Sequence, residues 1–328
     1  MSLLDHAPQF TAEHVTTIAR EVYGLSIVAQ ELPSERDQNF LLTTATNEHF
    51  VLKIANAFET RNLLEAQNEA MQHLEGRVSF CPRVINALSG ESITQILTKE
   101  SPHYVRLITF IEGQPLAKVE QSPALLFNFG ASLGKLTAAL ADFDHEALHR
   151  SFHWDLANGL RVITEYNVLF NENLLRQQMD EFAFKFKNEF SVQLNTLPRS
   201  IIHGDANDYN VIVDHDRVVG IIDFGDMVHS YRAGELAVAL AYVVLDKPDP
   251  VACARGLVKG YLSESVLTEA ELNLLWPLML LRLCMSVCMA AYQQQQKPDN
   301  EYLDISQRSI RAGLPGLLAI DVSAAILT

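Results

Sequence analysis

Two short stretches, "HGDANDYN" (203–210) and "IIDFGD" (221–226), bring together side chains that suit one kind of chemistry. Asp205 and Asn210 are five positions apart, and Asp223 lies thirteen positions beyond Asn210. A carboxylate beside a hydroxyl can orient it and accept its proton, and amide and carboxylate oxygens are ligands that Mg²⁺ prefers. In-line phosphoryl transfer needs this set of groups. We therefore expect Asp205 to be catalytic and Asn210 and Asp223 to be the metal ligands.

The same spacing occurs in the kinase catalytic loop H-R-D-x-x-x-x-N and the D-F-G that follows it. Phe224 is then expected to pack inward, and Gly225 lets the chain turn. The alternative is a polar turn in which Asp205 and Asn210 bond their own backbone. A turn explains one such residue easily, but it explains the three together much less well.

A lysine on an apolar strand provides the matching phosphate-binding group. Lys53 lies in "FVLKIAN", as in the V-A-I-K of kinases, and is expected to bind nucleotide phosphates. The alternative is an alternating strand with one lysine that faces solvent. The carboxylate partner of this lysine should come from the next helix, where Glu65 and Glu69 are one turn apart, and we favour Glu65.

The segment between the first two expected strands, "PSERDQNF" (33–40), contains no glycine. A G-x-G-x-x-G phosphate loop is therefore absent. Ser34, Arg36 and Gln38 are expected to share phosphate contact with backbone amides, although a polar hairpin tip is the simpler interpretation.

Two departures from the protein-kinase pattern indicate a small acceptor. Gly204 replaces the arginine of H-R-D, so this position cannot hold an activation-loop phosphate. After Gly225 the chain runs through "DMVHSYRAGELAVALAYVV" into an expected helix, with no activation segment and no A-P-E. The sequence therefore excludes a protein kinase.

The elements that must position these residues change along the chain. Strands are expected at 25–32, 38–45, 48–56, 92–98 and 103–111, with a helix at 62–75. Helices are expected at 123–143, 171–190, 234–245 and 274–292, with Gly130 and Gly134 allowing close packing. Residues 200–224 return to strand, as a β-hairpin that carries the polar stretch. These patterns predict an α+β fold, with a nucleotide-binding lobe at 1–108 and a catalytic and substrate-binding lobe at 109–328.

Composition excludes several classes of protein. The 328 residues are 48% hydrophobic and carry a net charge of -15 with no basic block, so neither nucleic acid nor an anionic membrane is an expected partner. Four cysteines without framework spacing and an N-terminus without signal-peptide features indicate the cytoplasm. The apolar segment 274–292 imitates a membrane span, but Arg282 at its centre favours a buried helix.

The two catalytic motifs resemble those of the aminoglycoside phosphotransferase and choline kinase family, and "PSERDQNF" and "HGDANDYNVIV" are similar to its hydroxylysine kinase branch. The resemblance spans essentially the whole chain. It implies a bilobal protein-kinase-like fold, with a small β-rich N-terminal lobe carrying one key helix and a large helical C-terminal lobe. It also implies Mg²⁺, ATP or GTP as phosphate donor, and an amino-alcohol or hydroxylysine-like acceptor. A hinge at Thr109, Phe110 and Ile111 would contact the base mainly through its backbone, which hides the base preference.

Candidate substrate residues follow from the charges of such an acceptor. An ammonium group would need carboxylates, and an amino-acid carboxylate would need a cation. The candidate carboxylates are Asp226, Glu235, Asp155 and Glu301, and the candidate cations are Arg232 and Arg282. For each of them, solvation or a structural ion pair is the alternative. Arg282 stands out because a charge inside an apolar helix needs a partner.

Two other functions remain open at this point. One is O-phosphorylation of aminoglycoside antibiotics, and the other is a nucleotide-binding pseudokinase that acts as a scaffold. The presence of Asp205, Asn210 and Asp223 together favours an active enzyme. The sequence leaves open the acceptor, the choice between ATP and GTP, and the oligomeric state.

Overall fold

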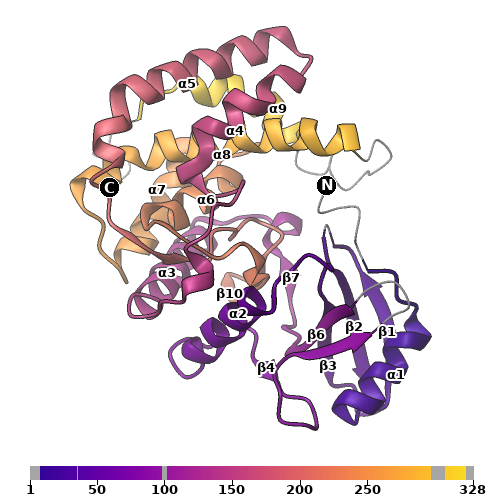
Figure 1. Ribbon diagram of the computed structural model, residues 1–328. Coiled ribbons are helices and arrows are strands. Elements are labelled where there is room, and N and C mark those ends of the chain that lie inside the picture. The colour runs from indigo at the N-terminus through magenta and orange to yellow at the C-terminus, as the bar shows by residue number, and fades with distance from the viewer. Residues whose placement is uncertain (1–7, 35, 98–101, 297–306, 323–328) are drawn as a thin grey trace. The chain divides into compact units, whose positions relative to one another are not determined.

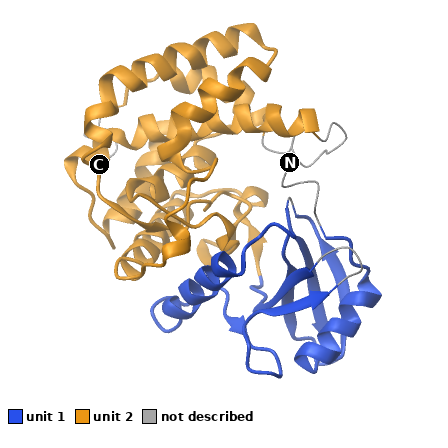
Figure 2. Ribbon diagram, viewed as in Figure 1, with its two compact units in different colours: residues 1–112 blue, residues 113–328 orange. Residues whose placement is uncertain are grey.

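The computed structural model describes residues 8–34, 36–97, 102–296 and 307–322. The chain divides into two compact units, residues 1–112 and 113–328 (Figure 2). This division falls slightly later than the predicted boundary at 108/109, so the predicted hinge residues belong to the first unit. Glu301, one of the predicted substrate residues, lies outside the described residues.

An antiparallel sheet forms the centre of the first unit (Figure 1). Its strands are β1 (Ile27–Leu32), β2 (Gln38–Thr44), β3 (His49–Ile54), β4 (Val84–Ile85), β5 (Thr94–Leu97) and β6 (Pro102–Thr109). They follow the order β1-β2-β3-β6-β4, and β5 pairs with the start of β6. All five predicted strands are present. The two-residue β4 was missed because so short a strand shows no alternation.

Two helices belong to this unit, α1 (Ala12–Tyr23) and α2 (Arg61–Leu74). The sequence predicted α2 but not α1. Helix α1 begins after the N-cap Thr11 and ends at Gly24, where φ is 70°. Its apolar residues Val15, Ala19 and Tyr23 recur at each turn and are buried against β2, β3 and β6. Ile18 and Val22 pack against the same core and complete the apolar face of this helix.

The strands of the second unit pair differently from the prediction. They are β7 (Gln114–Pro115), β8 (Arg199–Ile202), β9 (Val211–Asp214), β10 (Arg217–Ile221) and β11 (Val228–Tyr231). β8 pairs with β11, whereas β9 lies between β10 and β7. The predicted hairpin across the polar stretch is therefore wrong, and residues 203–210 form a crossover between two sheets. Side chains satisfy the backbone of this crossover in place of a strand ladder.

Helices make up most of the second unit. They are α3 (Pro123–Ala139), α4 (Gly159–Tyr166), α5 (Asn173–Leu194), α6 (Ala233–Val243), α7 (Pro250–Leu262), α8 (Glu269–Gln296) and α9 (Gln307–Leu318). Short 3-10 turns join them: η2 (Leu116–Lys118), η3 (Glu146–Leu148), η4 (Leu156–Asn158), η5 (Asn167–Leu169) and η6 (Phe224–Asp226). A β-rich first unit and a mainly helical second unit confirm the predicted α+β class.

Helices α3 and α7 pack with their backbones in contact (Figure 1). A Cβ atom on Gly130 would lie 1.9 Å from the carbonyl oxygen of Leu257, so only glycine fits there. The predicted role of this glycine in close packing is confirmed.

Helix α8 is the one helix among the described residues that is long and apolar enough to cross a membrane. However, 94% of its most apolar window is buried inside the protein, as expected for a core helix. The helix continues through Pro277 and places Arg282 in the interior, where this side chain is 2% exposed.

Candidate active site

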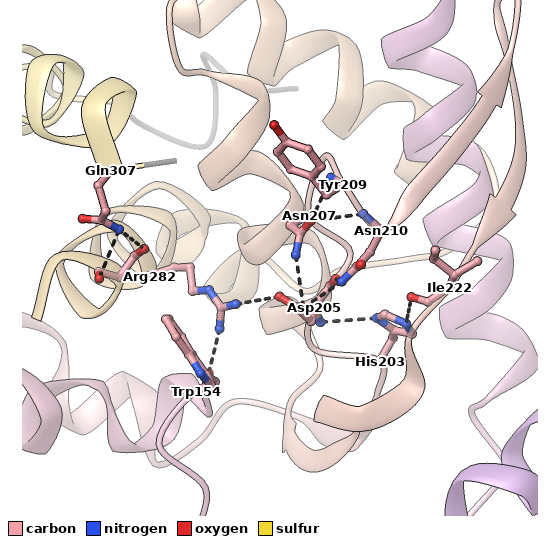
Figure 3. Close-up of polar contacts among 10 residues, drawn as sticks. Trp154, His203, Asp205, Asn207, Tyr209, Asn210, Ile222, Arg282 and Gln307 are labelled. Carbon is pink, nitrogen blue, oxygen red and sulfur yellow. Dashed lines mark hydrogen bonds and ion pairs between the residues drawn. The ribbon is translucent and has the colours of Figure 1, made fainter. Parts of the chain in front are cut away.

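Asp205 lies at the centre of a polar network in the crossover 203–210 (Figure 3). Its Oδ2 accepts hydrogen bonds from the side-chain amides of Asn207 at 3.1 Å and Asn210 at 2.8 Å. Its Oδ1 accepts one from the Arg282 guanidinium at 2.8 Å. Three donors from two distant parts of the chain therefore fix one carboxylate, and its side chain remains 18% exposed.

His203 links this loop to the segment that carries Asp223. Its Nδ1 accepts from the backbone N–H of Asp205 at 3.3 Å, so Nε2 carries the proton and donates to the carbonyl of Ile222 at 3.0 Å. The ring also packs edge-on against Phe224, with centroids 4.9 Å apart. The inward packing predicted for Phe224 is what the structure has.

Glu235 of α6 binds the backbone of the same loop, residues 203–210. It is fully buried, and its Oε2 accepts from the backbone N–H of His203 at 2.6 Å. Gly204 follows with φ 77°, and a Cβ there would meet the carbonyl oxygen of Asp226 at 3.2 Å. The glycine that replaces the H-R-D arginine is therefore also required by the backbone. As placed, the Glu235 carboxylate supports the loop and has no exposed surface for a substrate.

The two predicted metal ligands are oriented by their backbone and partners. The Asn210 amide nitrogen donates to both the carbonyl and the carboxylate of Asp205, so its oxygen faces away from them. Asp223 adopts the left-handed conformation, with φ 64° and ψ 78°, which is uncommon for a residue with a side chain. Such strained residues concentrate at functional sites. Among the described residues, no group of three or more His, Cys, Asp or Glu could hold a metal ion alone.

The charges of this region favour a bound cation. Burial raises the pKa of Asp205 well above the usual carboxyl range, and the nearby Asp226 and Asp223 raise it further. The Arg282 guanidinium beside Asp205 opposes this shift. The three neighbouring carboxylates Asp205, Asp223 and Asp226 suit a divalent ion bound through Asn210 and Asp223.

Asn207 is a site residue that the sequence analysis missed. Besides donating to Asp205, it accepts the backbone N–H groups of Tyr209 at 2.8 Å and Asn210 at 3.1 Å through its Oδ1. It therefore closes the turn and binds the Asp205 carboxylate with one side chain. An asparagine two positions after Asp205 is the Asx-turn signal that could have identified it.

The remaining substrate candidates have structural partners in the second unit. Arg232 forms a two-point ion pair with the buried Glu271, at 3.0 and 2.6 Å. Asp155 caps η4 through the N–H of Ala157 at 2.9 Å and accepts a hydrogen bond from Ser230. Asp226 is 8% exposed and lies within η6, beside the catalytic loop.

In the first unit, Lys53 and helix α2 lie on the same side of the sheet. Side chains alternate along β3, and Leu52 and Ile54 point into the core beneath α1. Lys53, 9% exposed, therefore points to the opposite face. Its cross-strand neighbour Arg106 donates there to Gln67 of α2 at 2.8 Å. The lysine thus faces the helix from which its partner was predicted.

The two candidate partners occupy different positions around α2. Leu64 packs in a cluster with Ala55 and Ile93, against Tyr104 of β6, and so faces the sheet. At about 100° per residue, Glu65 lies about 100° and Glu69 about 140° from Leu64. Glu65 is therefore nearer to the sheet, although its Oε1 already accepts from Arg61 Nε at 2.8 Å. The pairing of Glu65 with Lys53 stays a prediction.

The predicted phosphate-contacting side chains have other contacts. Gln38 accepts from the N–H of Phe10 at 2.7 Å and donates to the carbonyl of Phe10 at 3.0 Å and to Glu31 at 2.8 Å. This amide holds the segment before α1 against β2. Ser34 Oγ accepts from a side chain of β2 at 3.2 Å, and the carbonyl of Arg36 accepts from the segment after β3 at 3.2 Å.

The predicted hinge residues lie at the C-terminal end of β6, where two of them form backbone hydrogen bonds. The N–H of Thr109 donates to the carbonyl of Arg83 at 2.9 Å, and the N–H of Phe110 donates to that of His49 at 3.3 Å. Of the three hinge residues, Ile111 is the one whose N–H has no such partner among the described residues. Within this unit, the backbone N–H of Ile111 is therefore the hinge donor that can bind the nucleotide base.

A β-rich unit followed by a helical unit with a kinase-type catalytic loop defines a phosphotransferase. The sequence profile of the phosphotransferase enzyme family matches residues 28–274, and the chain belongs to this family. Hydroxylysine kinase of Danio rerio is 30% identical over 331 residues, covering 94% of this chain and 91% of that protein. Homoserine kinase of Bartonella henselae is 30% identical over 244 residues, covering 72% of each. The chain is a small-molecule kinase that acts on a hydroxyl group, as predicted.

Solved structures confirm the predicted kinase-like fold. An amicoumacin kinase superimposes with a TM-score of 0.74 at 13% identity, covering 97% of this chain and 98% of that one. A microcompartment-associated aminopropanol kinase gives a TM-score of 0.67 at 14% identity, covering 93% and 95%. At these identities the likeness concerns the fold alone.

Proposed function

We propose that this enzyme transfers the γ-phosphate of a nucleoside triphosphate to the hydroxyl of a hydroxylated amino acid, with 5-hydroxylysine as the first acceptor to test. The observation that carries this proposal is similarity over nearly the whole length to hydroxylysine kinases, at 30% identity over 94% of the chain for the Danio rerio protein. The short connection after η6 supports a small acceptor. The chain passes directly into β11 and then α6, with no segment that could dock a protein substrate.

Asp205 is the group that acts on the acceptor. It orients the attacking hydroxyl and accepts its proton as the new oxygen–phosphorus bond forms. Burial and the neighbouring carboxylates raise the pKa of Asp205 toward the neutral range, which is where a general base works best. The network around it restricts the carboxylate to one rotamer, so little reorganisation is needed on the way to the transition state.

Each unit has its own candidate groups for the donor. In the second unit, Asn210 and Asp223 would hold Mg²⁺, which, when bound, neutralises charge on the donor phosphates. In the first unit, Lys53, Ser34 and Arg36 are the phosphate-binding candidates, and Glu65 is the candidate that orients the lysine. Gln38 is a weaker candidate because its amide already bonds Phe10 and Glu31. The backbone of Thr109, Phe110 and Ile111 contacts the base of ATP or GTP.

Homoserine is the second acceptor to consider, because the homoserine kinase of Bartonella henselae is 30% identical over 72% of this chain. Homoserine and hydroxylysine share an amino-acid group and a side-chain hydroxyl, and they differ in the second amine. A carboxylate such as Asp226, which lies beside Asp205, could select for that amine. The two substrates therefore test whether a second ammonium group is recognised.

Product detection by mass spectrometry tests the proposal. Purified enzyme is incubated with hydroxylysine, homoserine, choline, ethanolamine or kanamycin, each with ATP and with GTP, with and without EDTA. We expect phosphohydroxylysine that disappears with EDTA and in Asp205→Asn. Phosphorylation of kanamycin or homoserine without hydroxylysine would overturn the acceptor assignment. Donor binding without any phosphorylated product would favour the pseudokinase.

A reducing compartment is also proposed. None of the four cysteines (Cys81, Cys253, Cys284 and Cys288) forms a disulfide, and burial raises the pKa of the Cys284 and Cys288 thiols. Cysteines without disulfides suit the cytoplasm. Localisation of a fluorescent fusion would test this, and secretion of the folded enzyme would contradict it.

A further inference from the structure

The hydrogen bonds to the Asp205 carboxylate indicate which of its two oxygens is open to the acceptor. A carboxylate has about four lone-pair sites, two on each oxygen. Asn207 and Asn210 together take both sites of Oδ2, at 3.1 and 2.8 Å. Arg282 takes one site of Oδ1, at 2.8 Å. Among the described residues, no further donor to this side chain is present, so one site on Oδ1 remains for the hydroxyl.

Arg282 is itself held rigidly. Its second terminal nitrogen donates to the carbonyl of Trp154 at 3.0 Å, and its guanidinium stacks over the indole ring of Trp154, 4.5 Å from the centroid. The Tyr242 hydroxyl lies beside the same guanidinium. Figure 3 shows Arg282 between Trp154 and Asp205. With 2% of its surface exposed, the side chain has no room to leave Asp205 and bind a substrate carboxylate.

We infer that Arg282 is a positioning residue for phosphoryl transfer, and that it directs the free lone pair of Asp205 Oδ1 toward the acceptor hydroxyl. This inference rests on the proposed function, because it assigns Arg282 a task in that reaction. The hydroxyl donates its proton to Oδ1 while its oxygen bonds the γ-phosphorus, and the nucleoside diphosphate leaves with the electrons of the broken phosphorus–oxygen bond. The sequence suggested that Arg282 binds the substrate. We instead assign it an indirect role, through Asp205.

Arginine is required here by geometry. One planar group must donate in two directions, to Asp205 and to Trp154, while it stacks on an aromatic face. A lysine ammonium lacks the plane and the second nitrogen, so it could keep the charge near Asp205 but would not fix the carboxylate rotamer. Substitutions of Arg282 can therefore separate the effect of its positive charge from the effect of its fixed orientation on Asp205.

The test compares Arg282→Met and Arg282→Lys with Arg199→Met. Arg199 also stacks on an aromatic ring of the second unit, 4.7 Å from the centroid of Tyr231, but has no contact with Asp205. We expect kcat to fall ~10²-fold in Arg282→Met, the size of effect seen when a reacting group is misplaced by about 1 Å. The KM values for acceptor and donor should stay near those of the wild type. Arg282→Lys should recover part of kcat, and Arg199→Met should keep all of it.

A double-substitution cycle distinguishes positioning from a merely structural role. If Arg282 acts through Asp205, Arg282→Met should add nothing to the loss already caused by Asp205→Asn. If Arg282→Met does not fold, Arg282→Lys takes its place in the same cycle. Additive losses, or a raised acceptor KM with unchanged kcat, would overturn the inference while leaving the kinase activity of the wild type established. A wild type that transfers no phosphate would instead refute the proposed function.

Discussion

The predicted site residues of the two units are held in different ways. In the second unit, Asp205 is fixed by side chains, namely two asparagine amides and a buried guanidinium. In the first unit, Lys53, Thr109 and Phe110 are fixed by the sheet and the backbone, as in the cross-strand pair of Lys53 and Arg106. Gln38 there uses its side chain to anchor the chain before α1.

This contrast follows from what each end of the reaction requires. Proton transfer needs one oxygen at one position, so a side-chain network that fixes a single rotamer is effective. Donor phosphates carry charge spread over many oxygens, and a loop of amides with a few cations can bind them with less exact geometry. We therefore expect substitutions in the network around Asp205 to act mainly on kcat, and those of the predicted nucleotide-binding residues in the first unit mainly on donor use.

The largest effect is expected from Asp205→Asn. Loss of a general base should lower kcat by ~10²–10⁴-fold while the dissociation constant of the donor changes little. Steady-state kinetics and calorimetry with nucleotide measure the two quantities. Asp214→Asn is the matched control, since Asp214 lies at the end of β9 with 67% of its side chain exposed. A kcat near that of the wild type would refute the assignment of Asp205.

A second large effect is expected from Asp223→Asn. Asparagine tolerates the left-handed conformation at φ 64°, so this change removes the negative charge without straining the backbone. Metal-dependent donor binding should weaken by at least the ~10–100-fold that loss of a mere outer-shell partner costs. Calorimetry with and without Mg²⁺ checks it. Equal affinities for wild type and variant would exclude Asp223 as a ligand.

The Lys53 partner gives an intermediate effect in the first unit. Lys53→Ala should reduce kcat/KM for the donor, and Glu65→Gln should reproduce part of this loss, up to ~10–100-fold for a charge-assisted contact. Glu69→Gln should have little effect because Glu69 lies further round α2 from the sheet. If Glu69→Gln is the more harmful variant, the partner has been assigned wrongly.

Sequence patterns predicted what depends on local spacing. The strands of the first unit and helix α2 follow from short, fixed intervals in the sequence, so their types and positions carried the information. The same kind of spacing led to Asp205, Asn210 and Asp223, whose roles as catalytic residue and metal ligands stay predictions. Helix α1 was missed although its apolar residues Val15, Ile18, Ala19, Val22 and Tyr23 recur with helical spacing on one face.

Long-range pairing was beyond the same patterns. The segment 199–202 reads as half of a hairpin, yet it pairs with 228–231 across the catalytic loop. Arg282 was noticed as a buried charge, but only folding shows that it bonds Asp205, seventy-seven positions earlier. Polar residues so far apart in the sequence share no periodic pattern. Their contacts depend on how the helices and strands pack, which the sequence patterns do not show.

The smallest expected effect concerns the support of the catalytic loop by Glu235. Burial raises the pKa of Glu235 to about 7, and the N–H groups of His203 and Gly204 oppose that shift only in part. In the unfolded chain this carboxyl ionises near its ordinary pKa of 4.5. Between these two pH values the folded protein binds more protons than the unfolded one. Its stability should therefore fall as pH rises through this window, by at most ~1.4 kcal/mol per pH unit.

Glu235→Gln isolates this contribution, because the amide oxygen can accept the same N–H bond of His203 but does not titrate. Urea unfolding of both proteins at pH 5, 6, 7 and 8 gives the difference in unfolding free energy, in which the titration of Asp205 and other shared groups cancels to first order. The variant should gain stability relative to the wild type from pH 5 to about 7 and then level off, on top of a constant offset for the new amide group. Parallel stability curves for the two proteins would mean that Glu235 has the same charge in the folded and the unfolded state between pH 5 and 8. The loop 203–210 would then be supported by an ionised carboxylate from α6. Side-chain charge would in that case fix both Asp205 and the loop that carries it.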